Sequence, residues 1–478
     1  MSRSSSTVPF PLFSPDKAAA AGLSVEGILR ELHALTPRAG TAPVRITGEG
    51  ALPSLFPVSD LAAATVGAAG SAVAELVGIS GGRPPSVAVD RRLASLWFGL
   101  SLRPQGWTVP PAWDGVAGDY AAGDGWIRLH TNAPHHRGRA LAVLGFDPEG
   151  EAGRDDVARV VREWTADGLE RAVVAAGGCA AAMRSSADWA EHPQGQAVAA
   201  APLIDVVPIS AGTRWAWRPD RERPLAGLKV LDLTRVLAGP SATRFLGGFG
   251  ARVLRIDPPF WDEPALVPEM TLGKRCARLD LGRPADRDRL ERLLAEADIL
   301  VHGYRADALA GLGFGEERRR TLNPGLIDIS LNAYGWDGPW RNRRGFDSLV
   351  QMSTGIAEAA MRHSGSDKPV PLPVQALDMA TGHLMAALAV RGVIRRLDIG
   401  QGMTARLSLA GTARLMTLLR QKARSEPPIV ETSADLGETE EITAWGAARR
   451  LRPPVAIKGA PMAWDRPAGP LGGDQPSW

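Results

Sequence analysis

The sequence is poor in cysteine and lacks the patterns that disulfide-rich and zinc-binding proteins share. Its 478 residues include two cysteines, Cys179 and Cys276, which lie far apart and form no CxxC pair. They indicate neither a disulfide framework nor a zinc site, and they fit a reducing, cytoplasmic setting. His130, His135 and His136 form the one histidine cluster. Because no other ligand type lies nearby at helical spacing, we expect no metal.

Long hydrophobic runs and clustered basic charge are also missing. Residues 1–17 contain no apolar core of signal-peptide length, and the apolar run at 173–183 is short and interrupted by glycine. Neither export nor membrane insertion is indicated. The net charge is +3, and arginines are spread along the chain without a lysine-rich tail. Nucleic acid is therefore not an expected partner.

The most informative stretch that is present runs from Pro371 to Gly411. Asp378 stands where a run of apolar and small residues begins, residues 379–396 have the pattern of a helix, and residues 403–409 alternate like a strand. A carboxylate at a helix start accepts backbone N–H groups and faces the positive end of the dipole. We therefore expect Asp378 to stay ionised, as a nucleophile must be, although most aspartates in such positions only cap the helix.

A similar stretch occurs near the start of the chain. Asp60 precedes a helix of small residues, a glycine turn and an alternating strand, and a glycine follows each acid after 22 residues, Gly82 after Asp60 and Gly400 after Asp378. An internal repeat is the economical interpretation. Two unrelated helix-turn-strand units remain the alternative, since the identities are few.

The whole chain divides by composition into five parts and one linker. An extension at 1–48 holds one amphipathic helix at 25–35, and a partial repeat follows at 49–116. A small α+β domain is expected at 117–213, with a polar linker at 214–224 after it. The larger domain spans 224–420, and the tail at 421–478 is polar apart from one strand at 455–458, with tryptophans that suggest it docks on the large domain.

The larger domain opens with a β-α-β pattern. Strands are expected at 230–233 and 252–256, with a tight turn at 238–240 and a helix from Ser241 to Gly248 between them. Further strands are expected at 298–301 and 326–332, with helices at 285–297 and 314–321. This α/β pattern predicts a Rossmann-like open parallel sheet, with a ligand crevice at the strand carboxyl ends. No G-x-G-x-x-G follows the first strand, so a dinucleotide is not expected.

Several motifs in this order resemble the family III CoA-transferases, a group that includes formyl-CoA and carnitine CoA-transferases and the related methylacyl-CoA racemases. Further matches to the small domain and the chain end extend the resemblance over residues 50–475. Because the small domain comes first here, the chain looks permuted relative to the family. The motifs that carry the resemblance are PLAGLKVLDLTRVLAGP from Pro224, GARVLRID from Gly250, GKRCARLDL from Gly273, ADALAGLGF from Ala306, LNPGLIDISLNAYGWDGPW from Leu322 and GFDSLVQMSTG from Gly345.

The resemblance implies a transfer of CoA from an acyl-CoA to a carboxylic acid. The family's nucleophile is an aspartate in a D-x-x-x-G motif, and Asp378 in DMATG matches it. This aspartate forms first an acyl anhydride and then an aspartyl-CoA thioester. Asp60, in DLAAA, lacks the glycine and is a weaker candidate for a shared site. CoA would be a substrate, with no permanently bound cofactor.

The racemases of this group pair the same aspartate with a histidine in a G-H-D motif. Here the triplet is GFD, so Phe346 stands in the histidine's place and cannot exchange a proton. Transfer is therefore favoured over racemisation, and Asp347 remains a candidate supporting residue. A non-catalytic CoA-binding homologue is the third alternative.

For CoA itself, the resemblance implies contacts from Lys274 and Arg275 and from the turn at Ala238, Gly239 and Pro240. The acidic-glycine-arginine segment usual after the second strand is missing, as is a glycine-rich lid loop. Without a lid, hydrolysis would compete with transfer. Family members form interlocked homodimers, so we expect a homodimer, or a monomer if the internal repeat closes the interface.

Overall fold

The main sheet of the molecule is a seven-stranded, mostly parallel sheet. The computed structural model describes residues 42–208, 215–418 and 426–478. The strand order is β10-β9-β8-β11-β12-β13-β7, and all neighbours are parallel except β13 and β7. The strands are β7 (Asp205–Pro208), β8 (Lys229–Leu233), β9 (Arg252–Asp257), β10 (Lys274–Arg278), β11 (Ile299–His302), β12 (Ile327–Asn332) and β13 (Met403–Ser408).

From β8 to β13 the spatial order is that of a doubly wound Rossmann sheet. The chain moves outward from β8 through β9 to β10 and then returns to the other side of β8 with β11. The point of reversal lies between β8 and β11, where a crevice opens at the carboxyl ends of the strands. The predicted fold class is confirmed. The helix predicted at 25–35 lies outside the described residues.

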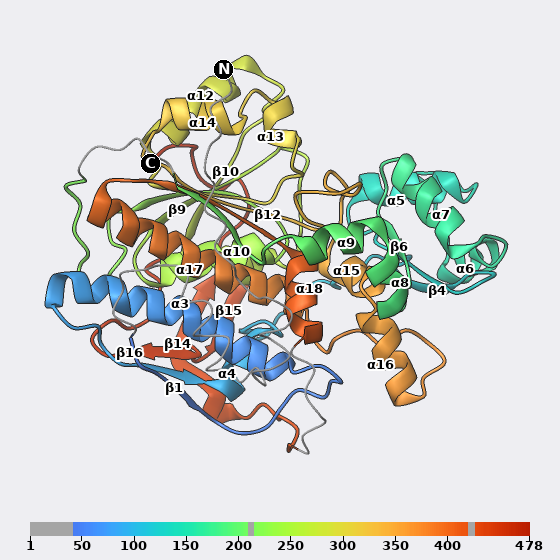
Figure 1. The fold of residues 1–478 in the computed structure, drawn as a ribbon, viewed down its shortest axis with the longest axis horizontal. Coiled ribbons are helices and arrows are strands. Elements are labelled where there is room, and N and C mark those ends of the chain that lie inside the picture. Colours follow the sequence, from blue (N-terminus) through green and yellow to red (C-terminus); the bar gives the residue numbers. More distant parts are fainter. Residues whose placement is uncertain (1–41, 209–214, 419–425) are drawn as a thin grey trace.

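Alternating side chains of the central strands pack into two cores on opposite faces of the sheet. Val230 of β8 packs with α10 (Ala238–Gly248) and α17 (Ala376–Ile399), whereas Leu231 packs with α12 (Pro284–Glu296) on the other face. Both faces of a parallel sheet are buried, and accordingly every residue of β11 and β12 is buried. Figure 1 shows α12, α13 (Ala308–Gly311) and α14 (Glu316–Leu322) above the sheet, with α10 and α17 below it.

A second long helix, α3 (Val58–Gly81), lies against α17, and each has 24 residues (Figure 1). A buried ion pair joins them, with Arg391 Nη1 3.1 Å from Glu75 Oε2. Both helices are apolar and long enough to cross a membrane, but 94% of each apolar window is buried inside the molecule, as in the core helices of globular proteins. After α3 come β2 (Val87–Asp90) and α4 (Arg91–Trp97), and after α17 come β13 and α18 (Leu409–Leu418).

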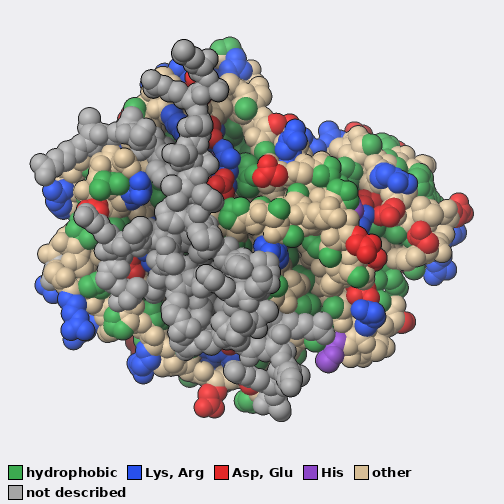
Figure 2. All heavy atoms as spheres, viewed as in Figure 1, with side chains coloured by type: hydrophobic (Ala, Val, Ile, Leu, Met, Phe, Trp, Pro, Cys, Tyr) green, Lys and Arg blue, Asp and Glu red, His purple; other side chains and the backbone are tan. Residues whose placement is uncertain are grey.

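The small domain has its own sheet and core and lies at one end of the molecule (Figure 1). On the face seen in Figure 2, acidic and basic side chains are interspersed over it. Two further helices lead from it towards the large domain. The elements are β4 (Gly118–Ala121), β5 (Trp126–Leu129), α5 (Pro134–Val143), α6 (Arg154–Val161), α7 (Ala166–Ala175), β6 (Ala180–Ala182), α8 (Ser186–Glu191) and α9 (Pro193–Ala200).

The C-terminal part contains a hairpin that the sequence pattern does not reveal. Residues 436–451 were expected to be polar chain without strands; instead they form two paired strands, which extend to a third from the N-terminal half. Farther on, Trp464 stacks on Trp97 with centroids 5.9 Å apart. The strands are β3 (Leu102–Pro104), β14 (Leu436–Thr443) and β15 (Gly446–Leu451), while β1 (Val44–Thr47) and β16 (Val455–Ile457) flank β2 in a third sheet.

Three short helices complete the described part of the large domain. The first, α11 (Val267–Met270), lies between β9 and β10, and the others, α15 (Asp347–Ser353) and α16 (Ile356–Ser364), lie between β12 and α17. Buried Leu349 and Met352 of α15 pack against Ala181 of β6. This contact fixes the small domain beside the start of α15.

Candidate functional site

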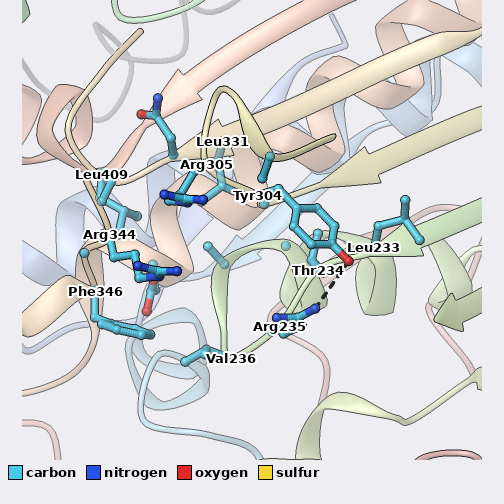
Figure 3. A pocket seen from close by; sticks show the side chains of 18 of the residues that line it. Leu233, Thr234, Arg235, Val236, Tyr304, Arg305, Leu331, Arg344, Phe346 and Leu409 are labelled. Atoms are coloured by element: carbon cyan, nitrogen blue, oxygen red, sulfur yellow. Dashed lines mark hydrogen bonds between the residues drawn. The ribbon is translucent and has the colours of Figure 1, made fainter. Parts of the chain in front are cut away.

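A cavity of about 340 Å³ lies at the reversal point of the main sheet. Leu233 at the end of β8, Gly303 just after β11 and Asn332 at the end of β12 line it, as the Rossmann rule predicts. Figure 3 shows the side chains that surround it. The small domain contributes His135 and His136 from α5. The cavity therefore lies between the two domains.

Asp378 lines this cavity from the first turn of α17 and is only 7% exposed. It does not cap the helix, because Gln375 is the N-cap residue and no side chain makes a cap hydrogen bond there. Burial, followed by the nearby charge of Asp347, raises the pKa of Asp378 well above its usual value. The prediction that capping keeps this carboxylate ionised is therefore wrong: desolvation outweighs the helix dipole.

Asp347 supplies the hydrogen bonds that Asp378 was expected to make. Its Oδ2 accepts the backbone N–H groups of Leu377 at 2.9 Å and Asp378 at 3.0 Å, and its Oδ1 accepts the amide of Gln351. Burial raises the pKa of Asp347 to about 6, against the lowering effect of these donors. The donors stabilise the charge of Asp347 rather than that of Asp378. Asp347 thus keeps the lower pKa of the pair, and the shared proton resides on Asp378.

Phe346 lines the cavity beside two histidines of the small domain. Its ring stacks on His130 with centroids 3.7 Å apart and meets His136 edge-on at 5.9 Å. Burial lowers the pKa of each histidine to about 3, so both are neutral at pH 7. Among the described residues, neither ring nitrogen of His136 has a hydrogen-bond partner, although the residue is 3% exposed. A neutral imidazole with an unused donor and acceptor thus borders the Asp378 cavity.

Four arginines make the cavity wall basic. Arg343 is neutralised by Glu170 at 2.7 Å, and Arg235 donates to the hydroxyl of Tyr304 at 3.3 Å. The remaining two, Arg305 and Arg344, lie close together in Figure 3. Asp378 is the one acidic residue among the lining residues. Such a charge balance raises the local concentration of anions.

Of the residues predicted to contact CoA, Ala238 and Gly239 line the cavity. They form the first turn of α10, so the tight turn predicted at 238–240 is wrong. A side chain at Gly239 would place its Cβ 2.2 Å from Thr234 Cγ2, so the close approach of α10 to the end of β8 requires glycine. The carbonyl of Pro240 accepts a bond from Lys274 Nζ at 2.9 Å.

Lys274, Arg275 and Asp60 lie away from the cavity lining. The Lys274 ammonium is fully buried, 3.0 Å from Asp232 Oδ2, and Arg275 binds the carbonyl of Ser477 at 2.8 Å. Asp60 lies in α3 and accepts a hydrogen bond from Arg91 at 2.9 Å. The structure therefore brings together Asp378, Asp347, Ala238 and Gly239, and the CoA contacts of Lys274 and Arg275 stay predictions.

The sequence reasoning missed the cavity's cations and did not connect its histidines with Asp378. His135 and His136 line the same cavity as Asp378, and the described residues hold no group of three or more potential metal ligands. Arg305 follows β11, and the rule that strand ends line the crevice would have identified it. Arg344 immediately precedes the GFD motif. Its position in the cavity depends on how the 333–346 segment crosses the strand ends.

Comparisons with known proteins show similarity to CoA-transferases. The model of CoA-transferase family III matches residues 225–433. These residues, less than half of the chain, are therefore similar to CoA-transferase family III. The family III match includes β8 to β13 and the segments that carry Phe346, Asp347 and Asp378. His135 and His136 lie outside it.

Individual CoA-transferases are similar over different lengths. An acyl-CoA transferase from Gibberella moniliformis is 31% identical over 347 residues, which cover 69% of this chain and 60% of that protein. The human succinyl-CoA:glutarate CoA-transferase is 31% identical over 206 residues, covering 40% of this chain and 47% of that protein. The chain thus spans about half to three fifths of the length of these relatives.

One solved structure similar to this chain is that of Rv3272 from Mycobacterium tuberculosis. It is 28% identical, with a TM-score of 0.38, and the alignment covers 41% of this chain and 58% of that protein.

Proposed function

We propose that this chain transfers CoA from an acyl-CoA to a carboxylic acid, with Asp378 as the nucleophile. The observation that carries the proposal is a carboxyl group buried in a basic cavity at the reversal point of a family III sheet. Relatives named CoA-transferases support the reaction class. The cavity supplies the cations that attract a carboxylate, and its neutral imidazole offers a hydrogen bond to substrate.

In the first half-reaction an Asp378 oxygen attacks the carbonyl carbon of the thioester. The C–S bond breaks, and the electron pair leaves with sulfur as CoA thiolate, which gives an acyl-aspartyl anhydride. The thiolate then attacks the aspartyl carbonyl of the anhydride. This step releases the first carboxylate and leaves an aspartyl-CoA thioester.

The second half-reaction runs these steps in reverse with the acceptor acid. The acceptor carboxylate attacks the aspartyl thioester and expels CoA thiolate, forming a new anhydride. The thiolate attacks the acceptor carbonyl, so acyl-CoA leaves and Asp378 regains its carboxylate. No net proton is consumed, but Asp378 must first lose the proton that its raised pKa favours.

Trapping of the intermediate tests the proposal. The protein is incubated with acetyl-CoA or succinyl-CoA, treated with hydroxylamine and analysed by peptide mass spectrometry. We expect a hydroxamate on the peptide containing Asp378 and none in the Asp378→Asn variant. The variant Asp60→Asn is the control, because Asp60 binds Arg91 outside the cavity, and it should be labelled like the parent. Turnover without labelling of Asp378 would refute the mechanism.

A second candidate, exchange of the proton next to the thioester, is supported by one observation. Phe346 removes the expected histidine from the motif, but His136 lies against the same ring with both nitrogens unused by the described residues. His136 and Asp378 would then form the acid-base pair. Deuterium uptake at the α carbon without an acceptor acid, lost in His136→Gln, would favour this activity over transfer.

A further inference from the structure

Val236, in the turn between β8 and α10, has a backbone conformation that valine disfavours. Its φ is 66°, and Leu100 is the only other described residue, glycines aside, with a positive φ. For a β-branched residue this left-handed region is an outlier that costs free energy, so neighbouring groups must hold it. Val236 lines the Asp378 cavity, whereas Leu100 does not (Figure 3). The strained turn therefore belongs to the wall of the site.

The buried side chain of Glu263 holds this turn. Its Oε2 accepts the backbone N–H of Val236 at 2.9 Å and the indole N–H of Trp261 at 3.0 Å. Its Oε1 binds the guanidinium of Arg255, a fully buried side chain of β9 that also pairs with Asp257. One carboxylate therefore joins the turn after β8 to the strand beside it.

The chain on both sides of Val236 is fixed by other contacts. Before it, the N–H of Thr234 donates to Asp232 Oδ1 of β8 at 2.9 Å. After it, Gly239 packs so closely against Thr234 that a Cβ would lie 2.2 Å from Cγ2. The backbone of Val236 thus sets the direction in which the chain enters α10. A rotation of this residue to negative φ would displace Ala238 and Gly239, which line the cavity.

We propose that Glu263 is a positioning residue of the acyl-CoA cavity: by binding the N–H of Val236 it holds the strained turn, and the turn places the start of α10 against the bound acyl-CoA. The inference rests on the proposed CoA transfer and adds to it a residue that acts through the backbone, because Glu263 itself does not line the cavity. Without this carboxylate, Val236 relaxes to negative φ, and the wall that Ala238 and Gly239 form is lost. The substrate then loses contacts in binding and in the transition state.

The experiment is a double-mutant cycle between Glu263 and Val236, read as kcat/KM for transfer from acetyl-CoA to the acid with the fastest turnover. Glu263→Ala should lower this value about 10- to 100-fold, the range expected when a left-handed residue loses its support. In the Val236→Gly background the same change should cost less than about 3-fold, because glycine adopts positive φ readily. In the Val236→Ala background it should again cost more than about 5-fold, since alanine also lacks the valine methyl groups but still disfavours this region.

Glu441→Ala is the matched control, because Glu441 is a carboxylate with the same kinds of partner outside the cavity lining. It binds the guanidinium of Arg450 at 2.5 Å and the backbone N–H of Ala468 at 2.7 Å, and Arg450 keeps Glu269 as a second partner. The effect of Glu441→Ala on kcat/KM should be the same with and without Val236→Gly. Thermal unfolding of each variant establishes that it is folded.

Equal losses from Glu263→Ala in all three backgrounds would overturn the proposal, because Glu263 would then act through its charge or through global stability. Two readouts are independent of turnover. Titration calorimetry with CoA should show the same dependence on the Val236 background in the dissociation constant, and this result would support the inference even if transfer failed. Hydrogen exchange followed by peptide mass spectrometry should be faster at the Val236 amide in Glu263→Ala, whereas unchanged exchange would overturn the inference even if the parent protein transfers CoA.

Discussion

Replacement of Asp347 by asparagine should shift the pH dependence of the reaction. Asp378 must be ionised to attack, and its pKa is raised by burial and by the charge of Asp347. Asparagine keeps an oxygen to accept the N–H groups of Leu377 and Asp378 but removes the charge. The pKa of Asp378 then falls, so the acid limb of kcat/KM against pH moves to lower pH.

The size of this shift follows from the geometry. Asp347 Oδ2 lies 3.0 Å from the amide nitrogen of Asp378. Standard bond lengths then keep the two carboxyl groups within about 7 Å of each other. At an effective dielectric constant of about 20, charges that close repel by at least about 2 kcal/mol, or about 1.5 pKa units. We expect the acid limb to move by at least about one unit.

The assay measures kcat/KM for the best acyl-CoA and acid pair from pH 5 to about 9. Gln351→Ala is the matched control, because it removes the hydrogen bond from Gln351 to Asp347 but leaves the charge of Asp347 in place. Its profile should move much less than that of Asp347→Asn, since a lost donor raises the pKa of Asp347 but leaves a group there that can still ionise. An unchanged acid limb in folded Asp347→Asn would show that Asp347 does not control the ionisation of Asp378.

Three further predictions concern stability. The pKa of Asp378 is raised on folding, so its contribution to stability is complete below about pH 4 and is lost as the pH rises through its folded pKa. Asp378→Asn should therefore unfold at a higher temperature than the parent protein at pH 8. An equal or lower melting temperature would contradict this. Glu269→Gln should lower the free energy of unfolding, measured by denaturant titration, by about 3–5 kcal/mol, because it leaves buried Arg244 without its carboxylate partner. A decrease of less than about 1 kcal/mol would contradict this prediction. Gly239→Ala should lower the melting temperature through its clash with Thr234, while an unchanged value would show that α10 moves freely.

Five of the seven strands of the main sheet could be predicted because their signals are local, whereas β7 and β10 were not predicted as strands. The mostly apolar β8, the alternating β12 and the small-residue helix α17 each carry their pattern in consecutive residues. The β14–β15 hairpin escaped prediction because its strand β14 is mostly exposed and polar, with no buried face to give an alternating pattern. Local signals thus located the core better than the surface.

The site was only partly predictable because its chemistry depends on contacts between distant segments. Asp378 was found from its motif, but its protonation depends on burial that only the packing of α17 reveals: Cβ at Gly382 would lie 2.3 Å from the carbonyl of Ala238. His136 belongs to another domain, and nothing near it in sequence points to Asp378. Arg344 lines the cavity and has no hydrogen-bond or ion-pair partner among the described residues, and no sequence pattern shows this.

The most direct test of the central claim follows an oxygen atom. A single turnover with an acceptor acid labelled with ¹⁸O in its carboxylate should leave one labelled oxygen on Asp378, because the bridging oxygen of the second anhydride comes from the acceptor. Peptide mass spectrometry should then show a gain of about 2 Da on the peptide containing Asp378. Turnover that leaves this peptide unlabelled would contradict the account.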